Sequence, residues 1–321
     1  MRRFPLSRTE VAALIAAPAI AFAALRWLDP GLQFLMCEVL TLFLVAQMWN
    51  LLAGFAGQMS LGHQLFVGAG AYLLFWISNN TSLPVWLVLA MVPPIVAIAA
   101  IPLGLVMFPL KHAYFAVGMW VVAEIAQQVV FLWPALGGTS GMILRPGGQA
   151  LRGFPEQVVL VIGILASIGL LIGLRLFLRT RLGLATLAMR DNERAAASAG
   201  VDVRRLHLLL FCLTGAGTAA AGAMYYTTTL YTSPLDAFQV TWVVSALFIT
   251  VIGGIGTLTG PVLGTILLIG LRETLTAWGW SGGQIWIVLG VIGILTLLWM
   301  PNGLWPALHS AFQRLARRPL P

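Results

Sequence analysis

Charged residues are scarce in this chain of 321 residues. They make up 9% of the sequence, whereas 60% of the residues are hydrophobic and the mean hydropathy is +0.93. Soluble globular domains carry roughly 25% charged residues, and a chain of this length cannot hide so much apolar surface from its solvent. The composition therefore excludes a water-soluble fold and predicts an all-α, polytopic integral membrane protein.

The sequence also lacks the patterns that most catalytic sites need. Lys111 is the single lysine and follows Pro109 and Leu110, so a GxxxxGK[ST] phosphate-binding loop is impossible. The four histidines are scattered without ligand spacing, there is no GxSxG elbow, and no two carboxylates are spaced for acid–base catalysis. We expect no catalytic residue, no metal and no cofactor on this chain.

Only two cysteines are present, and both lie within apolar runs. Neither Cys37 nor Cys212 has a CxxC or metal-ligand spacing, so we expect buried, inert thiols. Acidic residues are equally rare in the apolar runs: Glu38 and Glu124 are the two that fall plausibly within a span, whereas Asp29 and Glu273 are expected at its edges.

Apolar runs long enough to cross a bilayer recur along the whole chain. A helix needs about 20 apolar residues to span roughly 30 Å of hydrocarbon. About ten spans are predicted, at 10–28, 32–53, 61–78, 84–110, 114–133, 157–178, 206–230, 240–255, 258–277 and 284–300. The first could also be a cleaved signal peptide, but Arg26 and Trp27 favour a retained, anchored span.

The net charge of +8 is explained by topology. Thirteen of the 18 basic residues lie near the N-terminus, in the stretch 175–205, or near the C-terminus, as expected of cytoplasmic segments. An even number of spans places both termini and the segment 179–205 in the cytoplasm and the segment 134–156 outside. Arg145 and Arg152 are minor exceptions on the outer side. We expect no nucleic-acid partner.

Two spans end in glycine-rich breaks. One runs through Gly54 and continues over 57–62; the other runs over 253–257 and continues through Gly260-Pro261 to Gly264. Backbone that leaves helical geometry at membrane depth must be buried in protein or line a wet cavity, and paired breaks in two halves indicate a translocation pathway. The alternative is that the glycines only allow close helix packing; the match between the breaks is too loose to establish an internal repeat.

The polar segment 179–205 is predicted to contain one short helix over 184–199, ended by Gly200. A short helix on the cytoplasmic face is suited to dock into a groove on a partner. The alternative is an ordinary charged loop that only fixes topology. Arg190, Glu193 and Arg194 are the charged side chains we expect to make contacts with such a partner.

This segment, together with four others, resembles the permeases of branched-chain amino-acid ABC importers. The shared residues are Gly183, Arg190, Asn192, Glu193, Ala196, Gly200 and Val201, with the stretches 54–63, 137–141, 251–264 and 300–304. The similarity covers about residues 40–305 and is greatest to the M-type permease. One departure is Ser140, where the family usually has asparagine, and it weakens any inference about substrate from that loop.

The resemblance implies a single transmembrane permease domain over 1–321, in the bacterial inner membrane. It also implies a second homologous permease, two cytoplasmic ATPase subunits that bind ATP and Mg²⁺, and a periplasmic binding protein. The implied cargo is a branched-chain or other hydrophobic amino acid. Alternatives are an ABC permease for urea, amides, aromatic acids or a sugar, or a secondary transporter or channel driven by an ion gradient, which the shortage of acids within the spans disfavours.

Two sets of residues are predicted to act in transport. Helix ends and unpaired backbone groups at the breaks can bind a zwitterion without fixed charges, and an acid within a span is a functional candidate; a packing role for His63 and an interhelical hydrogen bond for Glu124 are the alternatives. The predicted pathway residues are Gln58, Ser60, His63, Glu124, Ser245, Gly253, Gly254 and Gly256. The predicted ATPase-coupling residues are Gly183, Arg190, Asn192, Glu193, Arg194 and Gly200.

Overall fold

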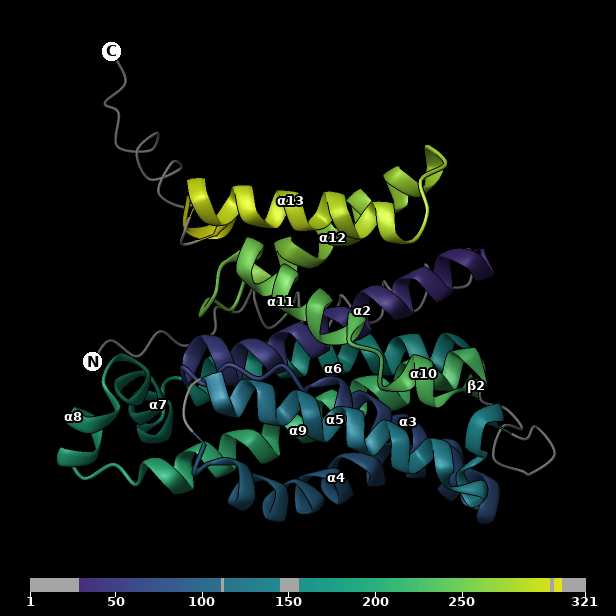
Figure 1. The fold of residues 1–321 in the computed structure, drawn as a ribbon, viewed down its shortest axis with the longest axis horizontal. Coiled ribbons are helices and arrows are strands. Elements are labelled where there is room, and N and C mark those ends of the chain that lie inside the picture. The colour runs from purple at the N-terminus through teal and green to yellow at the C-terminus, as the bar shows by residue number, and fades with distance from the viewer. Residues whose placement is uncertain (1–28, 111–112, 145–155, 301–302, 308–321) are drawn as a thin grey trace, which may run out of the picture.

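The computed structural model describes residues 29–110, 113–144, 156–300 and 303–307 (Figure 1). The predicted first span, 10–28, lies outside these residues. Each of the other nine predicted spans corresponds to a helix. These helices are α2 (Pro30–Asn50) with the π-helical turn η1 (Leu51–Phe55), α3 (Gln64–Asn80), α4 (Val85–Met107), α5 (Ala113–Leu132), α6 (Glu156–Phe177), α9 (Val203–Thr229), α11 (Thr241–Gly253), α12 (Gly260–Ala277) and α13 (Gly283–Trp299).

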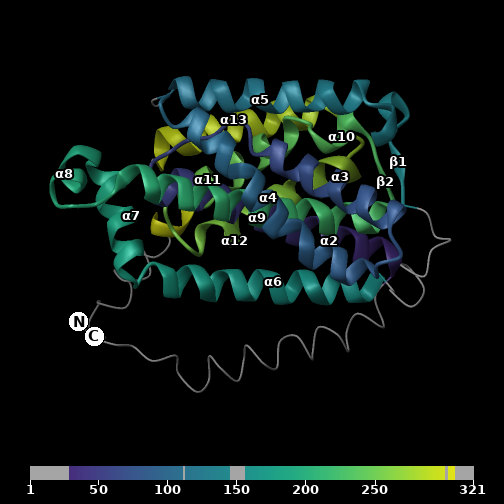
Figure 2. The same cartoon turned by 90° about the horizontal axis from the view of Figure 1, so that it is seen from below.

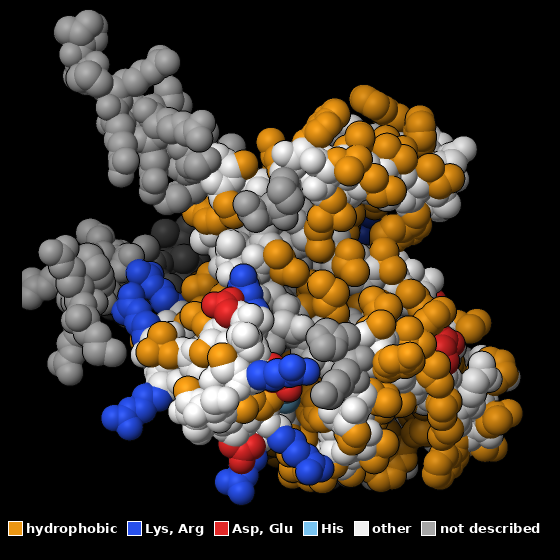
Figure 3. Space-filling view, turned by 60° about the vertical axis from the view of Figure 1, so that its left-hand side comes forward, with side chains coloured by type: hydrophobic (Ala, Val, Ile, Leu, Met, Phe, Trp, Pro, Cys, Tyr) orange, Lys and Arg blue, Asp and Glu red, His pale blue; other side chains and the backbone are white. Residues whose placement is uncertain are grey.

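Six described helical segments are long and apolar enough to cross a membrane by themselves. They are Pro30–Phe55, Val85–Met107, Ala113–Leu132, Gln157–Phe177, Val203–Thr229 and Pro234–Gly253. The polytopic all-α prediction is confirmed. Large hydrophobic side chains also remain exposed on the outer helices, including Leu132 and Trp299 at more than three quarters of their surface. In Figure 3 such side chains cover most of the visible body, whereas Lys and Arg side chains gather over one end.

Short elements mark the two ends of the helix bundle (Figures 1 and 2). At one end, helices α7 (Arg181–Asp191) and α8 (Glu193–Ser198) project from the body. At the other end, β1 (Met142–Ile143) pairs antiparallel with β2 (Tyr231–Thr232), next to the short helix α10 (Pro234–Ala237) and the 3-10 turns η2 (Pro134–Leu136) and η3 (Gly138–Ser140). The basic residues of 179–205 therefore lie at the end opposite the β pair.

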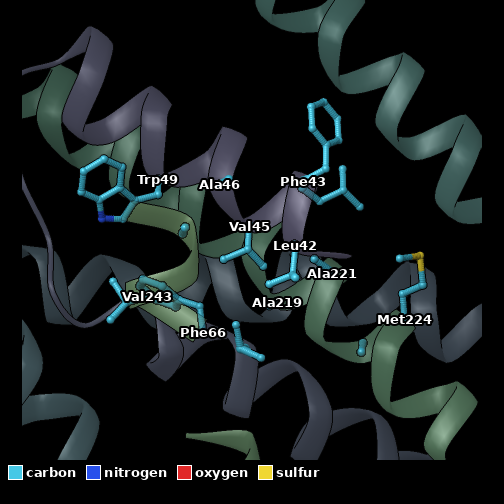
Figure 4. Close-up of a cluster of buried hydrophobic side chains, with 14 of the residues drawn as sticks. Leu42, Phe43, Val45, Ala46, Trp49, Phe66, Ala219, Ala221, Met224 and Val243 are labelled. Atoms are coloured by element: carbon cyan, nitrogen blue, oxygen red, sulfur yellow. The ribbon is translucent and has the colours of Figure 1, made fainter. Parts of the chain in front are cut away.

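The core forms where α9 packs against α2, α3 and α4. Close approach depends on small residues: a Cβ on Gly70 would collide with the carbonyl of Ala219, and one on Gly222 would collide with the backbone of Val67. Figure 4 shows the adjoining hydrophobic cluster, which includes Val45 of α2 and Ala219 of α9. Such small-residue contacts are how helices associate in lipid, where apolar burial gives no net drive.

The segment 179–205 contains two helices, so the prediction of one helix over 184–199 was wrong. Asn192 has φ −158° and ψ 103°, and this extended conformation ends α7. The Asn192 side chain then accepts a hydrogen bond from the amide of Ala195 at 3.0 Å and caps α8. An asparagine that satisfies the free amides of a new helix competes with continuation of the old one, and that competition divides the segment.

Candidate functional site

The two glycine-rich breaks meet in space, although about 200 residues separate them in sequence. Asn50, the last residue of α2, is fully buried and bridges them. Its Nδ2 donates to the carbonyl of Thr257 at 2.8 Å, and its Oδ1 accepts from the amide of Gly256 at 2.8 Å. One turn earlier, Gln47 Nε2 donates to the carbonyl of Leu258 at 2.6 Å. The side chains of α2 thus pair the backbone groups that the second break leaves without helical partners.

Glycine is required where the breaks touch. Gly256 has φ +71°, a conformation that L side chains rarely adopt, and a Cβ there would lie 3.0 Å from the carbonyl oxygen of Gly54. A Cβ on Gly54 would lie 2.6 Å from the amide nitrogen of Gly256. The backbones of the two breaks are therefore in direct contact, with no space for a side chain between them.

Arg190 reaches this contact from helix α7. Its Nη1 donates to the carbonyl of Gly54 at 2.9 Å, while its side chain remains 41% exposed. A Cβ on Gly256 would lie 2.5 Å from the same Nη1. We call Asn50, Gly54, Arg190, Gly256 and Thr257 the junction. It joins the polar segment at the end of the bundle to both breaks through one guanidinium group.

Replacing Gly256 with alanine should disrupt the junction, because the added methyl group would strain the backbone and overlap the Arg190 guanidinium. We expect a clear loss of uptake in vesicles together with a lower midpoint of thermal unfolding. Gly270→Ala is the matched control, since a Cβ at Gly270, within α12, meets no atom within 4 Å. Equal behaviour of the two variants would contradict this role for Gly256.

The other glycines of the second break differ in kind. Gly254 has φ +131° and its carbonyl accepts from the Thr257 hydroxyl at 2.7 Å. Gly253 is the last residue of α11 and packs against the carbonyl of Gly260. It therefore allows the backbones of α11 and α12 to approach each other closely. Gly303, from the C-terminal motif, packs against Gly254 with φ +83°. Four of the resemblance motifs, including the polar segment that supplies Arg190, therefore converge at or beside the junction.

The first break places its polar residues differently. Gln58 is partly exposed, and its backbone N–H donates to the carbonyl of Leu52 at 2.9 Å. Ser60 is fully buried; its carbonyl accepts from Trp49 Nε1 at 2.8 Å and its hydroxyl accepts from the amide of Gly62 at 3.3 Å. These contacts give Ser60 a structural role in holding the loop before α3.

His63 and its neighbour Gln64 are fully buried, and their side-chain polar atoms have no hydrogen-bond partner among the described residues. The His63 ring packs edge-on against Phe66, with ring centroids 6.0 Å apart. Buried polar groups without partners cost free energy, of order 1–3 kcal/mol each. In this conformation His63 therefore has a packing role. In a different conformation of the protein its ring nitrogens could form hydrogen bonds.

Glu124 lies apart from the junction, near the middle of α5. Its Oε1 accepts from Trp120 Nε1 at 3.1 Å one turn earlier. Both residues line a groove of about 430 Å³ on the outer face of α5, together with Gln128 and large apolar side chains. A carboxylate at this depth is costly in hydrocarbon. We therefore expect this face of α5 to be covered by protein or water.

A larger cavity, of about 470 Å³, lies towards the end of the bundle that carries β2 and α10. Its walls come from α2, α9, α10, α11, α12 and α13, and Ser245 is the predicted pathway residue that lines it. Glu38 of α2 and Arg272 of α12 form a two-point ion pair in its wall, with Nη1–Oε1 2.5 Å and Nη2–Oε2 2.7 Å. The sequence placed Glu38 within a span but gave no signal that Arg272, 234 residues away, is its partner.

The remaining predicted coupling residues lie on the projecting segment. Glu193 and Arg194 begin α8 and are exposed. Gly200 has φ +89° and follows Ala199, the C-terminal cap of α8, so the helix ends where the sequence predicted. Gly183 makes no turn; it lies inside α7, where a Cβ would collide with the backbone of Phe177 and Leu178. Within the described residues, no three His, Cys, Asp or Glu side chains are grouped to hold a metal ion.

Comparison with known proteins places the chain in a family. Residues 31–300 match the family model described as the branched-chain amino acid transport system / permease component. The chain belongs to this family of permeases. No solved structure was found to match it significantly.

Relatives of this permease agree with the family match. It is 27% identical over 285 residues to the high-affinity branched-chain amino acid transport system permease protein LivM of Escherichia coli (strain K12), covering 80% of this chain and 66% of the relative. It is 27% identical over 252 residues to the probable branched-chain amino acid transport permease protein LivH of Methanocaldococcus jannaschii, covering 72% and 76%. The L-arabinose transport system permease protein AraH of Escherichia coli (strain K12) is 28% identical over 144 residues, covering 44% and 42%. The permease spans slightly less than two thirds of the LivM length.

Proposed function

We propose that this permease is the membrane-spanning subunit of an ATP-binding-cassette importer that moves amino acids, branched-chain or otherwise hydrophobic, across the bacterial inner membrane. The observation that carries the proposal is the junction. One arginine of the projecting α7–α8 segment, Arg190, contacts the carbonyl of Gly54 beside Gly256. A partner that moves this segment would therefore move both breaks, which is the linkage that an externally powered pathway needs.

The segment offers a surface suited to such a partner. Glu193 and Arg194 are exposed on α8, at the end of the bundle where the basic side chains gather. That clustering supports a cytoplasmic location for this end under the positive-inside rule, with both termini on the same side. The ATP and Mg²⁺ would bind two cytoplasmic ATPase subunits, because this sequence has no phosphate-binding loop. This chain itself would not be an enzyme.

A second, homologous permease subunit is the proposed cover for the outer face of α5. Glu124 and Gln128 lie in a groove there among large apolar side chains such as Ile125. A partner helix would remove the carboxylate from lipid and leave it beside a shared, polar pathway. In that position Glu124 can accept a hydrogen bond from a substrate ammonium group. A periplasmic binding protein would deliver the substrate from the opposite end.

Reversing the charges of Glu193 and Arg194 should uncouple ATP hydrolysis from uptake. In the variant Glu193→Arg/Arg194→Glu, partner contacts of opposite sign become repulsive, while the helix keeps its net charge. We expect copurification of the ATPase subunits to weaken and radiolabelled leucine uptake in proteoliposomes to fall at least tenfold. The control is Asp202→Asn/Arg205→Gln, which removes an exposed ion pair at 3.0 Å from the same region.

The outcomes of this experiment separate the proposed function from its alternatives. Uptake that follows an ion gradient and needs no ATPase subunit would identify a secondary transporter instead. ATP-driven uptake of urea, an amide, an aromatic acid or a sugar, but of no aliphatic amino acid, would keep the importer and change its cargo. Transport-stimulated ATP hydrolysis that is unchanged in the charge-reversed variant would remove the α7–α8 segment from the mechanism.

A further inference from the structure

The cavity of about 470 Å³ has a lining that combines charge, aromatic rings and apolar side chains. Glu38 and Arg272 form its ion pair, with side chains 18% and 26% exposed. Asp236 of α10 lies in the same wall. A volume of this size is within the range of small-molecule sites, of about 300–1,000 Å³. Leu42 and Leu268 supply an apolar wall.

The charge of the lining is negative overall. Arg272 is shared between two carboxylates: besides the two contacts to Glu38, its Nη2 and Nε donate to Glu273 Oε1 at 3.0 and 3.2 Å. Four of its five N–H groups are therefore engaged. Asp236 lines the cavity together with Glu38, so the lining carries two carboxylates and one guanidinium, that of Arg272. Inside a medium of low dielectric constant, such an imbalance attracts a cation.

Three aromatic rings in the lining strengthen the preference of the cavity for a cation. Tyr225 packs edge-on against Tyr226 and against Trp242, with ring centroids 5.2 and 5.1 Å apart. All three line the cavity, as does Asp236, and Trp242 Nε1 donates to the backbone carbonyl of Asp236 at 3.1 Å. Aromatic faces attract ammonium groups, most strongly where water is excluded.

Ser245 adds a polar group with no internal partner. It is 4% exposed and lines the cavity, and no hydrogen bond to its hydroxyl forms within the described part of the chain. A buried hydroxyl of this kind needs a partner in the cavity itself, either water or a ligand. Ser245 can donate to a ligand carboxylate, and the one remaining Nη1 hydrogen of Arg272 can do the same.

We propose that this cavity is a binding site for the zwitterion of a free amino acid. The ammonium group is held at the acidic and aromatic side, beside Asp236 and Trp242. The carboxylate is held by Ser245 and the free Arg272 donor, and the aliphatic side chain packs on the apolar wall. The inference rests on the proposed function, because it names a binding site for the cargo of the same importer.

The fold links this site to the junction through two helices. Glu38 and Asn50 are both on α2, and Ser245 lies on α11, which ends at Gly253 beside the second break. The two helices contact each other between these points, where the Thr250 hydroxyl donates to the carbonyl of Ala46 at 3.3 Å. Occupancy of the cavity and rearrangement of the junction therefore act on the same pair of helices.

The test is equilibrium binding of radiolabelled L-leucine to the assembled transporter in nanodiscs, without ATP and without the binding protein. We expect saturable binding that weakens at least tenfold in Glu38→Gln/Arg272→Gln. Replacing both members avoids the uncompensated charge that removal of one partner alone would leave in the wall. Trp242→Leu, which keeps the pair and removes an aromatic face, should weaken binding severalfold. Asp202→Asn/Arg205→Gln, which removes an exposed pair from the other end of α9, should bind as the wild type does.

Competition identifies the group that the cavity recognises. Leucine amide, which keeps the ammonium group, should displace leucine, whereas 4-methylpentanoate, which keeps only the carboxylate, should not. Wild-type affinity in both cavity variants, equal competition by the two probes, or displacement of leucine by ethanolamine lipids would overturn the proposal. If ATP-driven leucine uptake persists while no leucine binds here, the cavity assignment fails and the proposed function stands. Without any amino-acid uptake, both fail.

Discussion

Replacing Arg190 with glutamine is expected to abolish most substrate uptake while the ATPase subunits continue to hydrolyse ATP. The change removes the hydrogen bond from Nη1 to the carbonyl of Gly54. This hydrogen bond is 2.9 Å long and partly buried. Hydrogen bonds to charged groups contribute roughly 1.5–3 kcal/mol, and about 1.4 kcal/mol corresponds to a factor of ten. Uptake per ATP hydrolysed should therefore fall about tenfold or more.

Two further variants make this result specific. Arg190→Lys keeps a charged donor that can reach the same carbonyl, and we expect it to recover part of the coupling. Arg181→Gln removes the same charge from an exposed position on the same helix and should transport normally. Parallel measurements of ATP hydrolysis and leucine uptake in proteoliposomes check the prediction. Normal coupling in Arg190→Gln would show that α7 acts on the breaks by another route.

Replacing Asn50 with leucine is expected to have the largest effect on stability. Leucine has nearly the same size but can make neither of the two hydrogen bonds to Gly256 and Thr257, each 2.8 Å long. The amide of Gly256 and the carbonyl of Thr257 would remain unpaired at a partly buried position. A fully buried unsatisfied group costs roughly 1–3 kcal/mol, so about 6 kcal/mol is the upper bound for the two together, and water that reaches them lowers this cost.

The measurement is the midpoint of thermal unfolding of the purified complex in detergent, with leucine uptake as the second readout. Asn50→Leu should lower the midpoint by several degrees and remove uptake. The control is Asn80→Leu, because Asn80 is exposed at the end of α3 and donates only to the carbonyl of Trp76 in its own helix. An unchanged midpoint in Asn50→Leu would mean that the breaks are held together by packing alone.

These contacts give the conformational cycle of a permease a physical starting point. In the described state the two breaks are closed on each other at the junction, and the Arg190 side chain, being 41% exposed, is accessible to a partner. The buried polar groups of His63 and Gln64 have no partner among the residues that the structure describes, which disfavours this state relative to one in which they are paired. A small free-energy change at α7, supplied by a bound partner, can then shift the populations of two conformations of the breaks.

The sequence by itself determined the membrane environment, the nine spans that fall within the described residues, the two breaks and the family. Each follows from residues close together in the chain: apolar runs of sufficient length, glycines where helices end, and motifs in a fixed order. Local information also had a limit. It predicted one helix over 184–199, because alanine favours helix, and it missed the capping bond of Asn192 to Ala195 that divides it.

Only the tertiary structure decided which groups meet. Three contacts join residues far apart in the chain. The separations are 206 residues for Asn50 and Gly256, 136 for Arg190 and Gly54, and 234 for Glu38 and Arg272. No local pattern encodes such contacts, because they depend on how closely α2, α11 and α12 pack and on which face each helix turns inward. Small residues set those distances, and the polar side chains then pair with the backbone groups or side chains that the packing brings within reach.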